Sequence, residues 1–238
     1  MYSFPSRIRY SETDYDGKLK LISLLNLFQD CTSFHSEDIG LGIKYHSDRQ
    51  IGWVLNAWQI DIERYPKFGE TVEIGTFPYD FKKFMGYRNF FLLDQNHHEI
   101  AKANSVWTLV DLKTGRPIVP NEDILKGYRL HPKLSMEYLD RKIVIPCEDY
   151  ETYDAIEVME YHLDTNHHVN NGQYVKLAHD LSDHSKEIIR MRAEYNKSAK
   201  LGDHLVPKLF RGNRCDFFVF ENKDGVKYAT VYLEYLDN

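Results

Sequence analysis

The hydrophobic positions of this chain follow a helical period in two separate segments, and alternating runs come after each of them. In the earlier segment the apolar residues at helical spacing are Leu21, Leu24, Leu25, Phe28 and Cys31. In the later segment they are Tyr174, Leu177, Ala178 and Leu181. Apolar residues at that spacing form one face of an amphipathic helix. The pattern therefore predicts two helices, each near the front of one half of the chain.

The same order of strand-like segments follows each predicted helix. In the first half, residues 58–65 alternate, Gly69-Glu70 turns the chain, and residues 90–93 and 103–110 form apolar runs. In the second half, residues 189–195, the turn at Gly202-Asp203, and residues 217–220 and 229–235 repeat that order. Alternation bounded by glycine turns is typical of strands. The shared order favours an internal duplication, although two unrelated segments of mixed structure can also look alike at this resolution.

One helix followed by antiparallel strands is the α+β pattern, in which a helix covers one face of a sheet. Because the helix stands near the front of each repeat, the hotdog fold fits best. We therefore predict a double hotdog of two tandem repeats, the first in residues 1–135 and the second in residues 136–238. The charged, proline-containing segment 117–146 is interpreted as the linker.

Composition narrows the range of functions. The net charge of -6 over 238 residues does not favour a nucleic-acid partner. No run approaches the roughly 20 apolar residues that cross a bilayer, and the first residues lack the apolar core of a secretion signal. The cysteines (Cys31, Cys147 and Cys215) are odd in number and widely spaced, which does not suit a disulfide framework. We therefore expect a cytoplasmic protein that works without nucleic acid or membrane.

The densest group of reactive side chains leads into the second predicted helix, where Asp164, Asn166 and His168 lie two residues apart. Hydrolysis of a thioester needs an attacking water or carboxylate, a base, and donors for the developing oxyanion. Imidazole exchanges protons near neutral pH, an amide donates hydrogen bonds, and a carboxylate orients the base or attacks directly. A helix N-terminus adds backbone N–H groups. These three residues are therefore the predicted catalytic set.

Two simpler interpretations of this group stay open. Asp and Asn before a helix are most often caps, and on composition alone that interpretation is favoured. Alternatively, His162, His167 and His168 with Asp164 would bind a metal ion. No second cluster in the sequence completes a recognisable ligand set, so we expect neither a metal nor a cofactor.

The run from Asp164 through Asn166, His168, Val169, Asn170 and Asn171 to Tyr174 resembles the active-site motif of acyl-ACP thioesterases. Residues 53–74, from Trp-Val-Leu through Arg-Tyr-Pro to Glu-Ile, are similar to the stretch of that family that follows its first long helix. The resemblance implies hydrolysis of acyl-ACP to free fatty acid and ACP, ending fatty acid synthesis, without metal or cofactor. It assigns the catalytic Asp, Asn and His to Asp164, Asn166 and His168.

The sequence departs from the family at one place. The resemblance leads us to expect a Glu, followed in plant members by Cys, downstream of a Glu-Tyr strand. Counting from Glu194-Tyr195 places Ser198 and Ala199 there. Aligning Asp14 with Asp164 shows that the first repeat lacks the catalytic set. The residues that match Asp164, Asn166 and His168 are Asp14, Asp16 and Lys18, and a lysine keeps its proton at neutral pH. We therefore expect acyl-chain binding in the N-terminal repeat and catalysis in the C-terminal one.

Acyl carrier protein is strongly acidic, so its docking surface should be basic. Residues 186–214 hold eight Lys and Arg against three acidic residues, which favours ACP as the partner. An acyl-CoA thioesterase of the hotdog type and a non-catalytic acyl-binding protein stay open as alternatives. The sequence is compatible with a monomer and with a homodimer.

Overall fold

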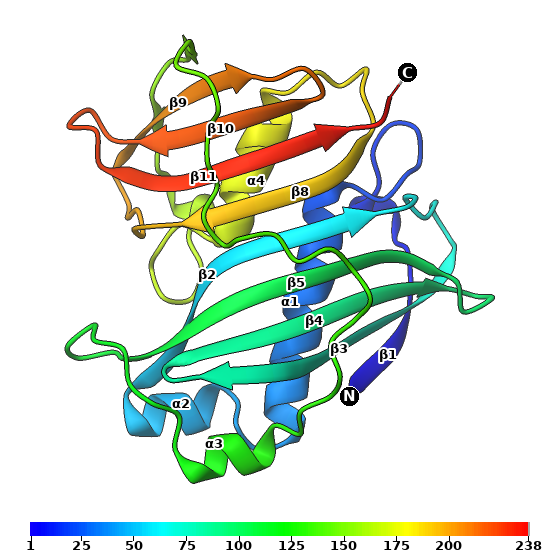
Figure 1. The fold of residues 1–238 in the computed structure, drawn as a ribbon, viewed down its shortest axis with the longest axis vertical. Helices are drawn as coiled ribbons and strands as arrows, with labels where there is room; N and C mark the ends of the chain where they lie inside the picture. The colour runs from blue at the N-terminus through cyan, green and yellow to red at the C-terminus, as the bar shows by residue number, and fades with distance from the viewer. Residues whose placement is uncertain (238) are drawn as a thin grey trace. The chain divides into compact units, whose positions relative to one another are not determined.

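The computed structural model describes residues 1–237 and divides the chain into two compact units. Unit 1 consists of Met1–Asn56 and Ile62–Tyr138, and unit 2 of Ala57–Asp61 and Leu139–Asn238. Figure 1 colours the first unit from blue to green and most of the second from green to red. Within residues 1–237, no helix is long and apolar enough to cross a membrane. The predicted repeat boundary at residue 135 and the roles given to the repeats stay predictions.

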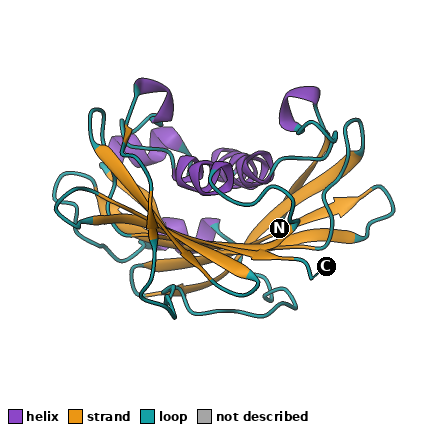
Figure 2. Ribbon diagram, turned by 90° about the horizontal axis from the view of Figure 1, so that it is seen from above, coloured by secondary structure: helices purple, strands orange, loops and turns teal. Residues whose placement is uncertain are grey.

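Unit 1 is an antiparallel sheet with a long helix on one face (Figures 1 and 2). Its elements are β1 (Tyr2–Arg7), α1 (Leu21–Asp38), α2 (Ile43–Arg49), β2 (Ile51–Ile62), β3 (Thr71–Lys82), β4 (Met85–Asp94), β5 (Glu99–Asp111) and α3 (Glu122–Gly127). Strands β1, β3, β4 and β5 are neighbours in that order. The apolar face of α1 supplies Leu25 and Phe28, both fully buried, and the Phe28 ring lies 5.3 Å from that of Phe90 on β4.

Unit 2 repeats this plan with a shorter helix. Its elements are β6 (Glu151–Thr152), β7 (Ile156–Glu157), α4 (Asn171–Asp180), β8 (Ile188–Tyr195), β9 (His204–Arg211), β10 (Cys215–Glu221) and β11 (Lys227–Tyr235). The strand order is β8-β11-β10-β9-β6, with β7 also on β9, and Ala57–Asp61 of β2 pairs with β8. Tyr174, Val175 and Ala178 of α4 are buried. The predicted α+β arrangement of a helix on an antiparallel sheet is therefore confirmed in both units.

The long hairpins show the duplication residue by residue. In each turn, the side-chain oxygen of the first residue accepts hydrogen bonds from two backbone N–H groups. The acceptor is Asp94 in β4–β5, with Asn96 (2.8 Å) and His98 (3.0 Å), and Asn222 in β10–β11, with Asp224 (3.0 Å) and Val226 (2.8 Å). Such side-chain acceptors replace a backbone turn. The predicted internal duplication is thus present in the hydrogen bonding.

The segment interpreted as a linker has structure of its own. Its α3 was not predicted, because six residues are too few to show a helical period. Ile124 and Tyr128 pack in a buried cluster with Leu41 and Leu109. Further on, the amide oxygen of Asn89 accepts hydrogen bonds from the N–H of Leu134 (3.1 Å) and the hydroxyl of Tyr138 (2.9 Å). Residues 117–138 therefore fold onto unit 1.

Candidate active site

The three predicted catalytic residues lie in one tight loop that ends at α4. An isolated antiparallel bridge between Leu163 and Val169 closes this loop. The carboxylate of Asp164 accepts hydrogen bonds from the backbone N–H of Asn166 at 2.8 Å and, more weakly, of His168 at 3.4 Å. The Asp164 N–H in turn donates to the carbonyl of His168 at 2.8 Å. One side chain therefore fixes the path of the backbone that carries the other two.

The first repeat contains the same loop. Asp14 accepts hydrogen bonds from the N–H groups of Asp16 and Lys18, both at 2.9 Å, and its own N–H donates to the carbonyl of Lys18 at 2.8 Å. Gly17 has φ +72 where His167 has φ +58. Asp14 and Asp164 therefore share a structural role within their loops. This role differs from the helix capping considered in the sequence, because the N-cap of α4 is Asn170. The role of Asp164 in catalysis stays a prediction.

Within residues 1–237, the side chains of Asn166 and His168 form none of the hydrogen bonds that hold this loop. Asn166 is exposed and His168 half-buried. In the part of the chain that the structure describes, the Asp164 carboxylate makes no hydrogen bond or ion pair with the His168 ring. The sequence suggested that Asp164 orients this imidazole or attacks directly, and in the structure its carboxylate accepts from the backbone. The loop thus presents an amide and an imidazole, and the carboxylate stays in the turn.

The other histidines of the motif do not join this pair. His162 is 6% exposed, its Nδ1 accepts the N–H of Met159 at 3.0 Å, and burial lowers its pKa. His167 is exposed at the tip of the loop. No group of three His, Cys, Asp or Glu side chains within residues 1–237 is arranged to hold a metal ion.

The N-terminus of α4 is capped by Asn170, which was not among the predicted site residues. Its side-chain oxygen accepts the N–H of Gly172 at 2.8 Å, and its carbonyl accepts that of Gln173, also at 2.8 Å. From the sequence, backbone N–H groups at this helix N-terminus are expected to act as donors to an oxyanion. The cap could have been read from the sequence, since Asn is a preferred N-cap residue. Two of the first N–H groups of α4 are therefore already hydrogen-bonded within the chain.

The segment expected to carry the family Glu lies beside the loop. The N–H of Val169 donates to the carbonyl of Ala199 at 2.9 Å, and Ser198, immediately before it, is exposed. In the first repeat, the N–H of Leu19 donates to the carbonyl of Pro66 at 2.8 Å in the same way. The structure therefore places Ser198 beside the loop, and its equivalence to the family Glu stays a prediction.

The Tyr of the motif belongs to the core. Tyr174 is 2% exposed, and its ring lies 6.1 Å from that of Tyr195 and 5.7 Å from that of Phe220. Tyr195 donates from its hydroxyl to the carbonyl of Asn171 at 3.0 Å, and burial raises its pKa. These aromatic contacts hold the first turn of α4 against the sheet.

The basic run at residues 186–214 is largely neutralised by acids from other segments. Arg190 pairs with Asp61 at 2.6 Å, Arg211 with Glu151 at 3.0 Å, and Lys208 with Glu221. The local excess of positive charge in the sequence is therefore not an exposed basic surface. Lys197 and Lys200, which flank Ser198, are the exposed members closest to the loop in sequence, and neither forms an ion pair within the described residues.

Comparison with known proteins places this geometry in context. Residues 2–128 match the family model described as the acyl-ACP thioesterase N-terminal domain. The chain is 28% identical over 186 residues to acyl-[acyl-carrier-protein] hydrolase FATB3, chloroplastic, of Cuphea viscosissima. That alignment covers 71% of this chain, which spans 43% of the length of the Cuphea protein.

Solved structures show the same fold. The acyl-ACP thioesterase of Bacteroides thetaiotaomicron superposes with a TM-score of 0.89 at 21% identity, over 98% of this chain and 97% of that one. The 12:0-ACP thioesterase of Umbellularia californica gives 0.84 at 20% identity, over 99% and 98%. The predicted double hotdog is confirmed.

The shared loop geometry generates a prediction about stability. Asp14→Ala and Asp164→Ala should each lower the free energy of unfolding by about 1 kcal/mol, the usual worth of a side chain that caps backbone N–H groups. Asp14→Asn and Asp164→Asn keep the accepting oxygen and should cost less. Urea denaturation measures all four variants. Asp164→Ala with wild-type stability would show that its carboxylate does not hold the loop.

Proposed function

Because this chain belongs to the acyl-ACP thioesterase family, we propose that it hydrolyses the thioester of acyl-ACP and releases free fatty acid. The observation that carries the proposal is the loop of the second unit, which holds its backbone through Asp164 and presents Asn166 and His168. An amide donor and an imidazole on a rigid turn are the groups that thioester hydrolysis needs.

The proposed reaction uses water as the nucleophile. The His168 imidazole takes a proton as the water oxygen bonds to the thioester carbonyl carbon. The Asn166 amide donates to the carbonyl oxygen as its negative charge develops. The C–S bond then breaks, and the imidazolium returns the proton to the leaving sulfur. Asp164 acts on these steps by holding the loop that carries both side chains.

The first unit supports the division of labour between the repeats. Its equivalent loop carries Lys18 where the second carries His168, and its α1 is lined with buried Leu and Phe. An ammonium is not a base at neutral pH, whereas an apolar helix face suits an acyl chain. The proposal is that unit 1 binds the chain and unit 2 cleaves the thioester.

Thiol release from a graded panel of acyl-ACPs and acyl-CoAs tests the substrate. Hydrolysis of acyl-ACP with little turnover of acyl-CoA supports the proposal. Preference for acyl-CoA would make the chain an acyl-CoA thioesterase, and binding without thiol release would make it an acyl-binding protein.

His168→Ala should lower turnover of acyl-ACP by about 10² to 10⁴, because a positioned acid–base group contributes that much to rate. Lys18→Ala, at the equivalent position of the first repeat, is the matched control and should keep wild-type turnover. Both are measured by thiol release, with circular dichroism to verify the fold. A folded His168→Ala enzyme with near-normal turnover would remove His168 from the mechanism.

Docking of the acidic carrier protein should depend on the exposed lysines beside Ser198. Lys197→Glu with Lys200→Glu should raise KM for acyl-ACP roughly 10-fold at low salt, less at high salt, and spare a small acyl thioester. Lys223→Glu with Lys227→Glu makes the same charge change on the exposed β10–β11 turn and should have little effect. An equal rise in KM for both pairs would show a general charge effect in place of docking here.

A further inference from the structure

The two repeats carry opposite buried charges at one equivalent position. The β4–β5 hairpin shifts register after Leu92, and the β10–β11 hairpin shifts after Phe220. Arg88 lies four residues before Leu92, and Asp216 lies four residues before Phe220, so the two positions are equivalent. Both are buried, with 6% of Arg88 and 4% of Asp216 exposed. Burying a charge costs free energy unless the charge is paired. The partners of Arg88 and Asp216 therefore indicate whether each charge is already balanced within the protein.

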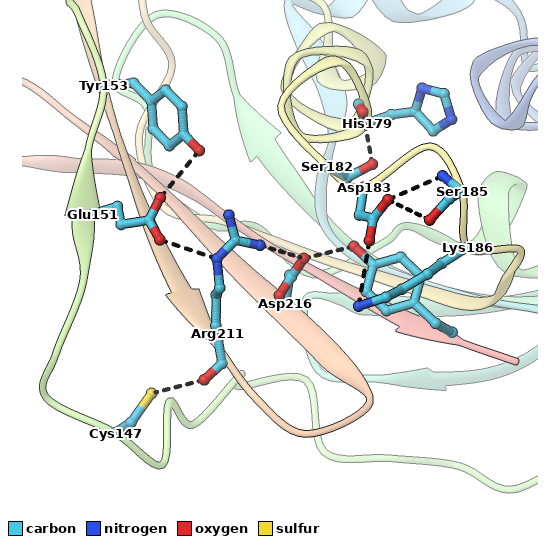
Figure 3. A network of polar contacts seen from close by, with 11 residues as sticks. Cys147, Glu151, Tyr153, His179, Ser182, Asp183, Ser185, Lys186, Arg211 and Asp216 are labelled. Carbon is cyan, nitrogen blue, oxygen red and sulfur yellow. Dashed lines mark hydrogen bonds and ion pairs between the residues drawn. The ribbon is translucent and has the colours of Figure 1, made fainter. Parts of the chain in front are cut away.

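The charge of Asp216 has its counter-charge within unit 2. Its carboxylate accepts the hydroxyl hydrogen bond of Tyr235 at 2.8 Å and lies 3.8 Å from the guanidinium of Arg211 (Figure 3). Arg211 also pairs with Glu151 at 3.0 Å. The network therefore balances Asp216 with a donor and a cation, as buried ionic groups require.

Every partner of Arg88 is neutral. One guanidinium nitrogen, Nη1, donates to Nδ1 of His35 at 3.0 Å and to Oγ1 of Thr76 at 3.2 Å, and the guanidinium carbon lies 5.2 Å from the ring centre of Tyr128. Within the described residues, no carboxylate pairs with Arg88, and its other nitrogens have no hydrogen-bond acceptor. An arginine has five N–H donors, so most of its donors and its whole charge are left for a ligand.

His35 cannot balance this charge. Its ring is 7% exposed on α1, and burial together with the Arg88 charge lowers its pKa to about 3. The imidazole is therefore neutral at pH 7 and accepts the Arg88 hydrogen bond. His35 therefore orients the guanidinium of Arg88 without neutralising its positive charge.

The surroundings of Arg88 select an amphiphilic ligand. Alternate residues of a strand share a face, so Arg88 and Phe90 point to the same side of β4. Phe90 packs against Phe28 of α1, and Thr76 pairs with Phe90 in the sheet register. The guanidinium thus stands in the apolar layer between α1 and the sheet. An alkyl chain that entered this layer would bring a terminal carboxylate to Arg88, and a guanidinium binds carboxylates through paired hydrogen bonds.

We propose that Arg88, oriented by His35, forms a subsite in unit 1 for the carboxylate of an alkyl chain. The carboxylate belongs either to a free fatty acid or to the far end of an ω-carboxyacyl substrate. The inference rests on the proposed function for the acyl nature of the ligand, and its test measures binding directly.

The test compares decanoate with decanol, which has the same chain without the charge. By calorimetry, Arg88→Met should weaken decanoate binding roughly 10- to 100-fold, the worth of a charge-assisted hydrogen-bonded pair, and leave decanol unchanged. Asp216→Asn removes the equivalent buried charge of unit 2 and should leave both affinities unchanged. Arg88→Met should also melt no lower than wild type without ligand, because it removes an unpaired buried charge.

Unchanged decanoate affinity in Arg88→Met would overturn the proposal, as would displacement of decanoate by equimolar inorganic phosphate. Turnover of dodecanoyl-ACP and of its ω-carboxy analogue then shows whether the bound carboxylate belongs to the substrate or to the fatty acid product. Slower turnover of the analogue alone in Arg88→Met indicates a substrate carboxylate, and relief of decanoate inhibition indicates a product carboxylate. If wild type hydrolyses neither thioester while decanoate binding depends on Arg88, the proposed hydrolysis fails and this subsite stands.

Discussion

The hydrogen bonds from two backbone N–H groups to one aspartate carboxylate determine the geometry of the candidate site. Asp164 accepts from Asn166 and His168, and the adjacent Val169 is tied to Ala199. Together these bonds fix where α4 begins and leave the Asn166 and His168 side chains available to a ligand. A carboxylate that accepts backbone N–H groups stabilises a turn without any other chemistry. The contribution that the structure shows for Asp164 is therefore architectural.

The same bonds occur around Asp14, so the two repeats have the same loop backbone and differ in the side chains that it carries. The first loop carries Lys18 where the second carries His168, and the backbone N–H of each bonds to the aspartate of its own loop. At the equivalent buried position of the β4–β5 and β10–β11 hairpins, Arg88 has no carboxylate partner within residues 1–237, whereas Asp216 pairs with Arg211. The two repeats thus share a backbone plan and differ in the side chains at equivalent positions.

Local pattern in the sequence was sufficient for most of the architecture. The helical spacing around Phe28 and the alternation in β8 and β11 predicted the layers, and aligning Asp14 with Asp164 predicted the equivalent loops. Short elements such as α3 were not predicted, because α3 is stabilised by the tertiary packing of Ile124 and is too short to show a helical period.

Charge pairing was the part that sequence could not show. Arg190 looked like part of a basic surface, but strand pairing brings Asp61, far away in the chain, to its side. Similarly, nothing around Arg88 in the sequence signals that it is buried among neutral partners. The sequence left both a structural and a catalytic role open for Asp164, because a carboxylate suited to catalysis and one suited to a turn are the same residue type.

Exchanging the loop residues between the repeats measures the division of labour most directly. The variants are Lys18→His, His168→Lys and the double exchange, each assayed for thiol release from acyl-ACP after its fold is verified. If chemistry resides in the second loop, Lys18→His turns over like wild type, and the other two variants are slower by at least about 100-fold. A double exchange that retains near-wild-type turnover would contradict that assignment, because activity would then follow the histidine into the first repeat.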